Sequence, residues 1–297
     1  MGLIQENTKW VLFLSSSEED PEHRHILDIA YGIFSLENSG VHQSDIHIYI
    51  DGHDRETILE LISTATSYNY NIKVTDDFFT DNQYNNYENM VIFVTGHGSI
   101  NGIDHNPPIT PYQLLNTIKS TPNLLKSIVY LGQCYAGVFN YIGAGRAHGK
   151  ESQRSADVIF IGATNLHESL STSTTESCLN GDVSWVANLF LLHVFKWISS
   201  PIDVDGDNKK TIIDSYKYAG VSSNAMNKGI KIRSFVNSMK LHSQWTIAQN
   251  THASSPTTQN ELSLKAITEQ YVGELTINYT HQECWILNAI PAQFIEI

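Results

Sequence analysis

The chain has 297 residues, of which 41% are hydrophobic, and this suits one large α/β domain, alone or with a small appendage. Its formal net charge of −13 excludes nucleic acid and an anionic membrane surface as main partners, because both attract basic patches. The cysteines Cys134, Cys178 and Cys284 are odd in number and widely spaced, which excludes a disulfide framework or a zinc motif built from them.

The first residues (MGLIQENTKW) contain no basic segment followed by an apolar core, and no apolar run in the chain reaches membrane-spanning length. We therefore expect a soluble protein without a membrane partner. It is expected to be cytoplasmic, or exported without a recognisable signal peptide. The sequence leaves the oligomeric state open.

Continuous apolar runs alternate with amphipathic segments over the first two thirds of the chain. Residues 10–14 and 46–50 form the first two runs, and helical patterns follow them at 22–36 and 55–66. Runs of the same kind recur at 91–95, 128–131 and 157–163. Apolar runs without alternation are typical of strands buried on both faces of a parallel sheet. The pattern predicts an α/β fold, with a doubly wound, mostly parallel sheet and helices on both faces.

The pattern changes in the last quarter of the chain. Short alternating runs such as 230–235 and 275–279 have the period of strands rather than of helices. We therefore expect a main domain over residues 1–221 and a strand-rich C-terminal extension over residues 222–297.

Two of the apolar runs stop at a reactive side chain followed by glycine. Residues 91–98 (VIFVTGHG) end with His97, and residues 128–137 (IVYLGQCYAG) contain Cys134. In a parallel sheet the ligand crevice lies beyond the carboxyl ends of the strands, so we expect the imidazole and the thiol to face each other there. A lone Cys is more often a core residue and a lone His is more often simply hydrogen-bonded. Together, the two indicate a nucleophile with its acid–base partner, and hence a cysteine peptidase.

The segment from Asp203 to Asp214 follows the spacing of an EF-hand loop. Asn208 replaces the usual glycine at its sharp turn and tolerates the left-handed backbone needed there. The sequence therefore predicts a structural calcium ion, with no cofactor for catalysis. The alternative is an acidic helix cap without an ion. The six expected ligands are Asp203, Asp205, Asp207, Lys209, Thr211 and Asp214.

Three local motifs accompany the His–Cys pair. Glu22-His-Arg-His25 opens the first predicted helix, residues 93–102 (FVTGHGSING) surround the histidine, and residues 163–169 (ATNLHES) follow the last buried run. With these motifs, residues 9–195 resemble the caspase-like clan of cysteine peptidases. Within the clan they resemble the legumain family, which includes the asparaginyl endopeptidases and the glycosylphosphatidylinositol transamidase catalytic subunit. The resemblance implies a caspase-like fold and endopeptidase activity on a protein or peptide substrate.

The resemblance also implies roles for individual residues. His97 would be the acid–base residue and Cys134 the nucleophile, and the backbone N–H groups of Gly98 and Cys134 would form the oxyanion hole. Glu22 stands where the family has an asparagine that helps to orient the histidine. A carboxylate can also accept a hydrogen bond from an imidazole N–H, so the same role is expected for Glu22.

Arg24, Ser169 and Asp182 fall where legumains line the pocket for the residue before the scissile bond. Ser169 and Asp182 stand at the two ends of a hydroxyl-rich segment that is predicted to be a loop. An arginine donor and an aspartate acceptor suit a carboxamide, which implies cleavage after Asn and secondarily after Asp. Gly132 departs from the family, which carries an acidic residue at that place.

Two other functions fit the same residues. In a transpeptidase or transamidase of this family, an amine rather than water would take the thioester formed at Cys134. In a catalytically silent member, the domain would serve only as a binding module, and the cysteine would not react with active-site probes.

Overall fold

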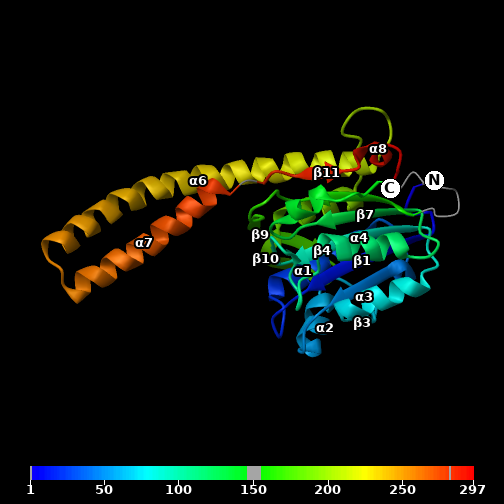
Figure 1. Cartoon of the computed structure of the whole chain (residues 1–297), viewed down its shortest axis with the longest axis horizontal. Coiled ribbons are helices and arrows are strands. Elements are labelled where there is room, and N and C mark those ends of the chain that lie inside the picture. Colours follow the sequence, from blue (N-terminus) through cyan, green and yellow to red (C-terminus); the bar gives the residue numbers. More distant parts are fainter. Residues whose placement is uncertain (1, 146–154, 281) are drawn as a thin grey trace. The chain divides into compact units, whose positions relative to one another are not determined.

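The computed structural model describes residues 2–145, 155–280 and 282–297 (Figure 1). The chain forms two compact units. One comprises Met1–Ser223 together with Gln282–Ile297, and the other comprises Asn224–His281.

The first unit contains a seven-stranded sheet with the strand order β11-β8-β7-β4-β1-β2-β3 (Figure 1). All neighbouring strands pair in parallel except β11, which runs antiparallel to β8. The prediction of a mostly parallel sheet is therefore confirmed. The bounds are β1 Thr8–Ser15, β2 Ile46–Ile50, β3 Ile72–Lys73, β4 Asn89–Gly96, β7 Lys126–Leu131, β8 Asp157–Gly162 and β11 Trp285–Leu287.

The central strands are buried on both faces because their apolar runs do not alternate with polar residues. Along β1, Leu12 belongs to one hydrophobic core and Phe13 to the other. The first core receives α1 (His23–Asn38), α2 (Arg55–Ser63) and α5 (Leu189–Ser199). The second receives α3 (Thr75–Asp81) and α4 (Pro111–Ser120). Helices thus cover both faces, and the fold is doubly wound as the sequence predicts.

The strand order places a switch point between β1 and β4. The chain runs from β1 outward through β2 to β3, and it runs from β4 outward in the other direction through β7 to β8. Loops that leave β1 and β4 at their carboxyl ends therefore diverge, and they open the crevice at which ligands bind in such sheets.

Short elements complete the first unit. Two antiparallel hairpins, β5–β6 and β9–β10, are separate from the main sheet. The second hairpin replaces the loop predicted from the hydroxyl-rich segment, because alternate threonine and serine side chains suit a solvent-exposed strand pair. The bounds are β5 Gly98–Ser99, β6 Gly102–Ile103, β9 Ser171–Cys178, β10 Gly181–Asn188, α8 Ala289–Ala292, and the 3-10 turns Gln43–Asp45, Asn82–Tyr84 and Ala136–Tyr141.

The prediction of a strand-rich extension over residues 222–297 is wrong. Two long helices, α6 (Ile212–Ser254) and α7 (Thr258–Tyr279), occupy most of this range, and only β11 adds a strand to the sheet. The alternation at residues 230–235 is too short to fix a strand. In α6 the apolar residues Ile232 and Phe235 are three positions apart and lie on one face of the helix, where they remain 56% and 58% exposed.

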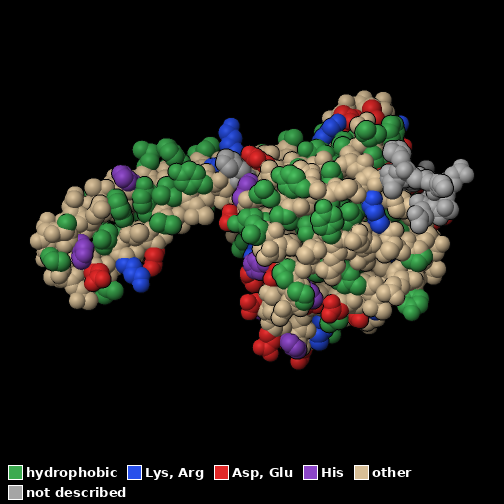
Figure 2. Space-filling model, in the orientation of Figure 1, with side chains coloured by type: hydrophobic (Ala, Val, Ile, Leu, Met, Phe, Trp, Pro, Cys, Tyr) green, Lys and Arg blue, Asp and Glu red, His purple; other side chains and the backbone are tan. Residues whose placement is uncertain are grey.

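The second unit is a helical hairpin in which α6 and α7 lie side by side (Figure 1). Hydrogen bonds link the two helices, for example from Trp245 Nε1 to Thr268 Oγ1 at 3.1 Å. Apolar side chains remain exposed along the hairpin (Figure 2), among them Val236, Met239 and Val272. Within the described ranges, no helix has the length and apolar character that crossing a membrane requires.

Candidate active site

His97 follows directly from the carboxyl end of β4. The strand ends at Gly96, whose φ of 107° lies in the left-handed region that side-chain-bearing residues rarely adopt. A side chain at Gly96 would also meet the Leu14 side chain and the Ser15 carbonyl of β1. The glycine therefore lets the chain turn sharply next to β1, and the His97 side chain remains 51% exposed.

Cys134 lies in the turn that follows the neighbouring strand β7. Tyr135 adopts a left-handed backbone with a φ of 55°, which costs a non-glycine residue about 1 kcal/mol or more. Two backbone hydrogen bonds to the loop after β8 hold this turn, from Tyr135 N to His167 O at 2.8 Å and from Gly137 N to Asn165 O at 3.1 Å. The strained turn directs the chain away from the sheet immediately after the cysteine.

The His97 and Cys134 loops are in direct contact. A Cβ added to Gly98 would collide with the carbonyl oxygen of Cys134 and with the Gln133 side chain. Only a glycine allows the two loops to approach this closely. The backbone N–H of Cys134 forms no hydrogen bond to another residue in the described part of the chain, so it remains available to a ligand.

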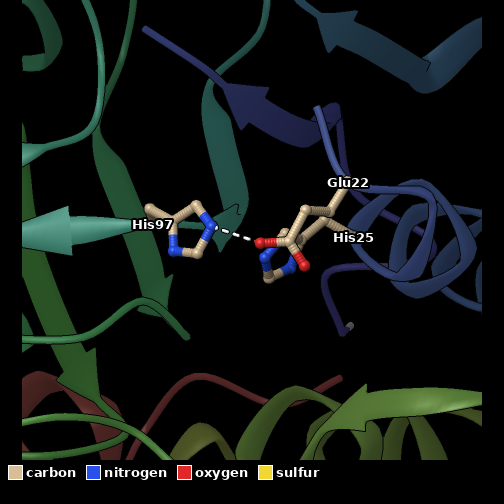
Figure 3. A group of neighbouring side chains, drawn as sticks. All are labelled: Glu22, His25 and His97. Carbon is tan, nitrogen blue, oxygen red and sulfur yellow. Dashed lines mark hydrogen bonds and ion pairs between the residues drawn. The ribbon is translucent and has the colours of Figure 1, made fainter. Parts of the chain in front are cut away.

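Glu22 accepts a hydrogen bond from Nε2 of His97 at 2.7 Å (Figure 3). Glu22 lies immediately before α1, in the connection from β1, so the two residues flank the switch point. The Nε of Arg24 donates to the other Glu22 oxygen at 2.6 Å. This hydrogen bond is the main cause, and the His97 contact a lesser cause, of a Glu22 pKa lowered to about 2. The carboxylate is therefore ionised at any physiological pH.

Arg24 connects this cluster to the β9–β10 hairpin. Its NH1 donates to Oγ of Ser171 at 3.2 Å, at the start of β9. Two residues earlier, the backbone N–H of Ser169 donates to Sγ of Cys134 at 3.3 Å. The segment 169–171 thus links the arginine to the thiol. The Ser169 hydroxyl is buried and has no hydrogen-bond partner among the described residues.

The thiol of Cys134 is partly removed from solvent. Burial raises its pKa above the ordinary value of 9.0, although the hydrogen bond from Ser169 N–H opposes part of this effect. The resting side chain is therefore a neutral thiol at physiological pH. To react as a nucleophile it must give its proton to a base, and His97 is on the neighbouring loop.

Beneath His97 lies a buried polar network that the sequence analysis missed. The imidazole of His25 meets that of His97 edge to face, with ring centroids 5.2 Å apart. Thr95 Oγ1 donates to Oδ2 of Asp28 at 2.8 Å and lies 3.3 Å from Nδ1 of His25. The other oxygen of Asp28 accepts from Nε1 of Trp185 at 2.9 Å. The sequence did contain a signal for this network, because the polar residues His25 and Asp28 lie on the predicted apolar face of the first helix.

Asp182 is not part of this cluster. In the β9–β10 register it pairs with Ser177, to which it is also hydrogen-bonded at 2.7 Å. Ser177 lies six residues beyond Ser171 along β9, which at about 3.3 Å per residue is roughly 20 Å. The structure therefore separates Asp182 from Arg24, because the segment between them is an extended hairpin rather than a compact loop.

The predicted calcium loop brings three of its six expected ligands together. One side-chain oxygen each of Asp203, Asp205 and Asp214 lies within 4.8 Å of the other two. Asn208 has a φ of 66°, the left-handed conformation expected at that position. Asp205 is also paired with Lys217 Nζ at 2.6 Å, so a cation entering the loop would compete with this ammonium group.

The other loop side chains make local hydrogen bonds. Asp207 accepts from the backbone N–H of Lys209 at 2.9 Å, and Thr211 Oγ1 donates to Asp214 at 2.9 Å. Asp214 also accepts from Thr211 N at 2.9 Å, just before the first turn of α6. This carboxylate thus already acts as a helix cap. Oδ2 accepts both Thr211 hydrogen bonds and Oδ1 accepts from Val204 N at 2.9 Å, so a metal would compete with these donors.

Of three comparisons with known proteins, only the one with solved structures finds similar proteins. No protein-family model matches the chain, and no curated protein matches it. The chain is similar to the crystal structure of caspase-1 from Spodoptera frugiperda, with a TM-score of 0.37 and 10% sequence identity. This similarity covers 67% of the chain and 74% of the caspase structure.

Proposed function

We propose that the chain is a cysteine endopeptidase in which Cys134 is the nucleophile, His97 the acid–base residue and Glu22 the group that orients His97. The observation that carries this proposal is the direct contact of the Gly98 and Cys134 loops beside the His97–Glu22 hydrogen bond. A thiol, an imidazole and an orienting carboxylate at one sheet edge are the parts that covalent acyl transfer requires. The legumain-like motifs at residues 22–25 and 163–169 support the same function.

The reaction would begin with proton transfer from the Cys134 thiol to His97. Because Nε2 of His97 faces the Glu22 carboxylate, Nδ1 is the nitrogen available to accept this proton. The thiolate then attacks the peptide carbonyl, and the imidazolium protonates the amine as the C–N bond breaks. Water, deprotonated by His97, hydrolyses the resulting thioester and restores the thiol. Ionised Glu22 balances the positive charge of the imidazolium during each transfer.

Two backbone N–H groups would stabilise the tetrahedral intermediate. Among the described residues the N–H of Cys134 has no acceptor other than its own Sγ, and Gly98 lies against the cysteine backbone. Donors aimed at charge that develops only in the transition state accelerate the reaction more than donors that bind substrate. We assign the oxyanion hole to these two groups.

For substrate preference, we propose Asn before the scissile bond and Asp as a weaker alternative. Arg24 offers guanidinium donors to a side-chain carbonyl or carboxylate. The Ser169 hydroxyl, which has no partner among the described residues, can donate or accept next to the thiol. Asp182 has no place in this pocket, so Ser169 would replace it as the acceptor for the amide N–H.

An active-site label tests the proposed function directly. The full chain is treated with an acyloxymethyl ketone that carries a peptide ending in Asn, and the modified cysteine is identified by mass spectrometry. We expect stoichiometric labelling of Cys134 that is lost after denaturation or in His97→Ala. Cys178 is the matched control, because it is also a partly buried free thiol but lies away from the proposed site. Equal labelling of both thiols would refute the proposal.

We also propose that the loop from Asp203 to Asp214 binds a structural calcium ion. The clustering of Asp203, Asp205 and Asp214 and the left-handed Asn208 support it. Calcium fits better than magnesium because it accepts more oxygen ligands in a flexible geometry.

A further inference from the structure

Glu22, His25 and His97 form a cluster of possible metal ligands within the candidate active site (Figure 3). One potential metal-ligand atom from each residue lies within 4.8 Å of those of the other two. Atoms bound to one zinc ion at about 2.0–2.2 Å can be no more than about 4.4 Å apart. Small side-chain rotations would therefore bring all three within coordination distance.

The hydrogen bonds of His25 prepare one of its nitrogens for a cation. Thr95 donates its hydroxyl proton to Asp28, so it can only accept from Nδ1 of His25. Nδ1 consequently carries the proton and Nε2 carries a lone pair. Nε2 is buried and has no hydrogen-bond partner among the described residues, and the whole His25 residue is only 3% exposed. An unpaired buried acceptor beside a carboxylate and a second imidazole favours a cation between them.

We infer that these three residues bind a zinc-class divalent cation, and that the bound ion holds the enzyme inactive. Two imidazole nitrogens and one carboxylate oxygen are a ligand set that zinc prefers. The Thr95 hydroxyl, which accepts from Nδ1 of His25 and donates to Asp28, is the outer partner that metal-binding histidines commonly have. Arg24 donates closely to Oε2 of Glu22, at 2.6 Å, and only at 3.4 Å to Oε1, the oxygen that contacts His97, so Oε1 is the oxygen a metal would take.

Inhibition follows from the proton that His97 must accept, and this part of the inference rests on the proposed peptidase function. A neutral imidazole that gives its Nε2 lone pair to a metal keeps its proton on Nδ1. It can then no longer take the proton of the Cys134 thiol. The metal also replaces the Glu22–His97 hydrogen bond, so His97 loses its orienting partner.

Metal binding is measured first, independently of activity, on the full-length Cys134→Ser variant. Cobalt(II) is titrated while its visible absorption is followed, and zinc is then titrated against a chromophoric indicator. We expect one site without a thiolate charge-transfer band. His25→Gln should weaken binding by more than about tenfold, because even outer partners of metal ligands change affinity by about 10–100-fold. His97→Gln, which alters a half-exposed side chain, keeps the test valid where the buried substitution unfolds the protein.

A histidine outside the cluster provides the control, and activity provides the second readout. His242→Gln, in the second unit, should bind the metal as tightly as the parent. Zinc should inhibit peptide cleavage by the wild type, and a chelator should reverse this. Unchanged binding in both His25→Gln and His97→Gln, or binding that disappears with Cys134→Ser, would overturn the inference. Absence of peptidase activity with intact metal binding would refute the proposed function but leave the metal site standing.

Discussion

Glu22 and His97 are hydrogen-bonded at 2.7 Å although 75 residues separate them in the chain. The strand order explains this, because the connection after β1 and the loop after β4 diverge from adjacent strands at the switch point. Arg24 keeps the carboxylate ionised. His97 is therefore held by a residue that lies outside the Cys134 loop.

Replacement of Glu22 should lower turnover more than it lowers substrate affinity. Glu22→Ala removes both the orienting acceptor and the charge, and we expect kcat to fall roughly 10²-fold. Glu22→Gln keeps an acceptor oxygen and should lose less. Steady-state kinetics on an Asn-containing peptide measure both parameters, with the exposed Glu56→Gln of α2 as a control. An unchanged kcat in Glu22→Ala would remove the orienting role.

The pH dependence of Cys134 labelling should reveal its raised pKa. In a Cys178→Ser, Cys284→Ser background only Cys134 can react with iodoacetamide. In His97→Ala, the rate should keep rising with pH through 9.0, because burial places the thiol pKa above that value and only the thiolate reacts. With His97 present, labelling near pH 7 should be faster. A rate that reaches its plateau by pH 7 in His97→Ala would show that the thiol is already ionised without the base.

Substrate preference should depend on Arg24 but not on Asp182. Arg24→Ala removes a donor beside Ser171 and should reduce cleavage after Asn by more than tenfold, since a polar pocket rejects poorly paired groups strongly. Asp182→Ala should leave kcat/KM unchanged, because the residue lies near the far end of the hairpin. Paired kinetics on peptides with Asn and with Asp at the cleavage position measure this. Equal losses in the two variants would contradict the assignment.

Calcium should stabilise the first unit through the loop from Asp203 to Asp214. Free calcium at about a hundred times its Kd adds about 2.7 kcal/mol, which should raise the Tm of a unit of this size by roughly 5 to 11 °C. Asp205→Ala should abolish the increase while preserving labelling of Cys134. Asp77→Ala, an exposed acidic substitution in α3, serves as the matched control. Identical melting curves in calcium and in chelator would reduce the loop to a helix cap held by Asp214 and Thr211.

The buried strands were predictable because a continuous apolar run is stable as a strand where both of its faces are covered. Residues 91–95 and 128–131 lie within β4 and β7 for this reason. The C-terminal helices were missed because too short a window was considered. The six residues at 230–235 alternate as a strand does, whereas the helical spacing of Ile232, Phe235 and Met239 emerges only over a longer window.

The structure brings together some of the residues that the local motifs single out and separates others. The approach of the His97 and Cys134 loops, and the contact of Glu22 with His97, follow from residues at strand and helix ends. Asp182 was misplaced because its distance from Arg24 depends on whether the intervening segment is a loop or a hairpin. The partnerless nitrogen of His25 could not be predicted, since it depends on tertiary hydrogen bonds of Thr95 with Asp28.

The assignment of Cys134 as a peptidase nucleophile is tested most directly by peptide cleavage. The wild type and Cys134→Ser are compared on a positional-scanning peptide library, and the products are identified by mass spectrometry. We expect the wild type to cut after a single preferred residue, Asn, and the variant to show no turnover while melting at the same temperature. Cleavage that persists in Cys134→Ser, or a folded wild type that cleaves no peptide in chelator-treated buffer, would contradict the assignment of Cys134 as a peptidase nucleophile.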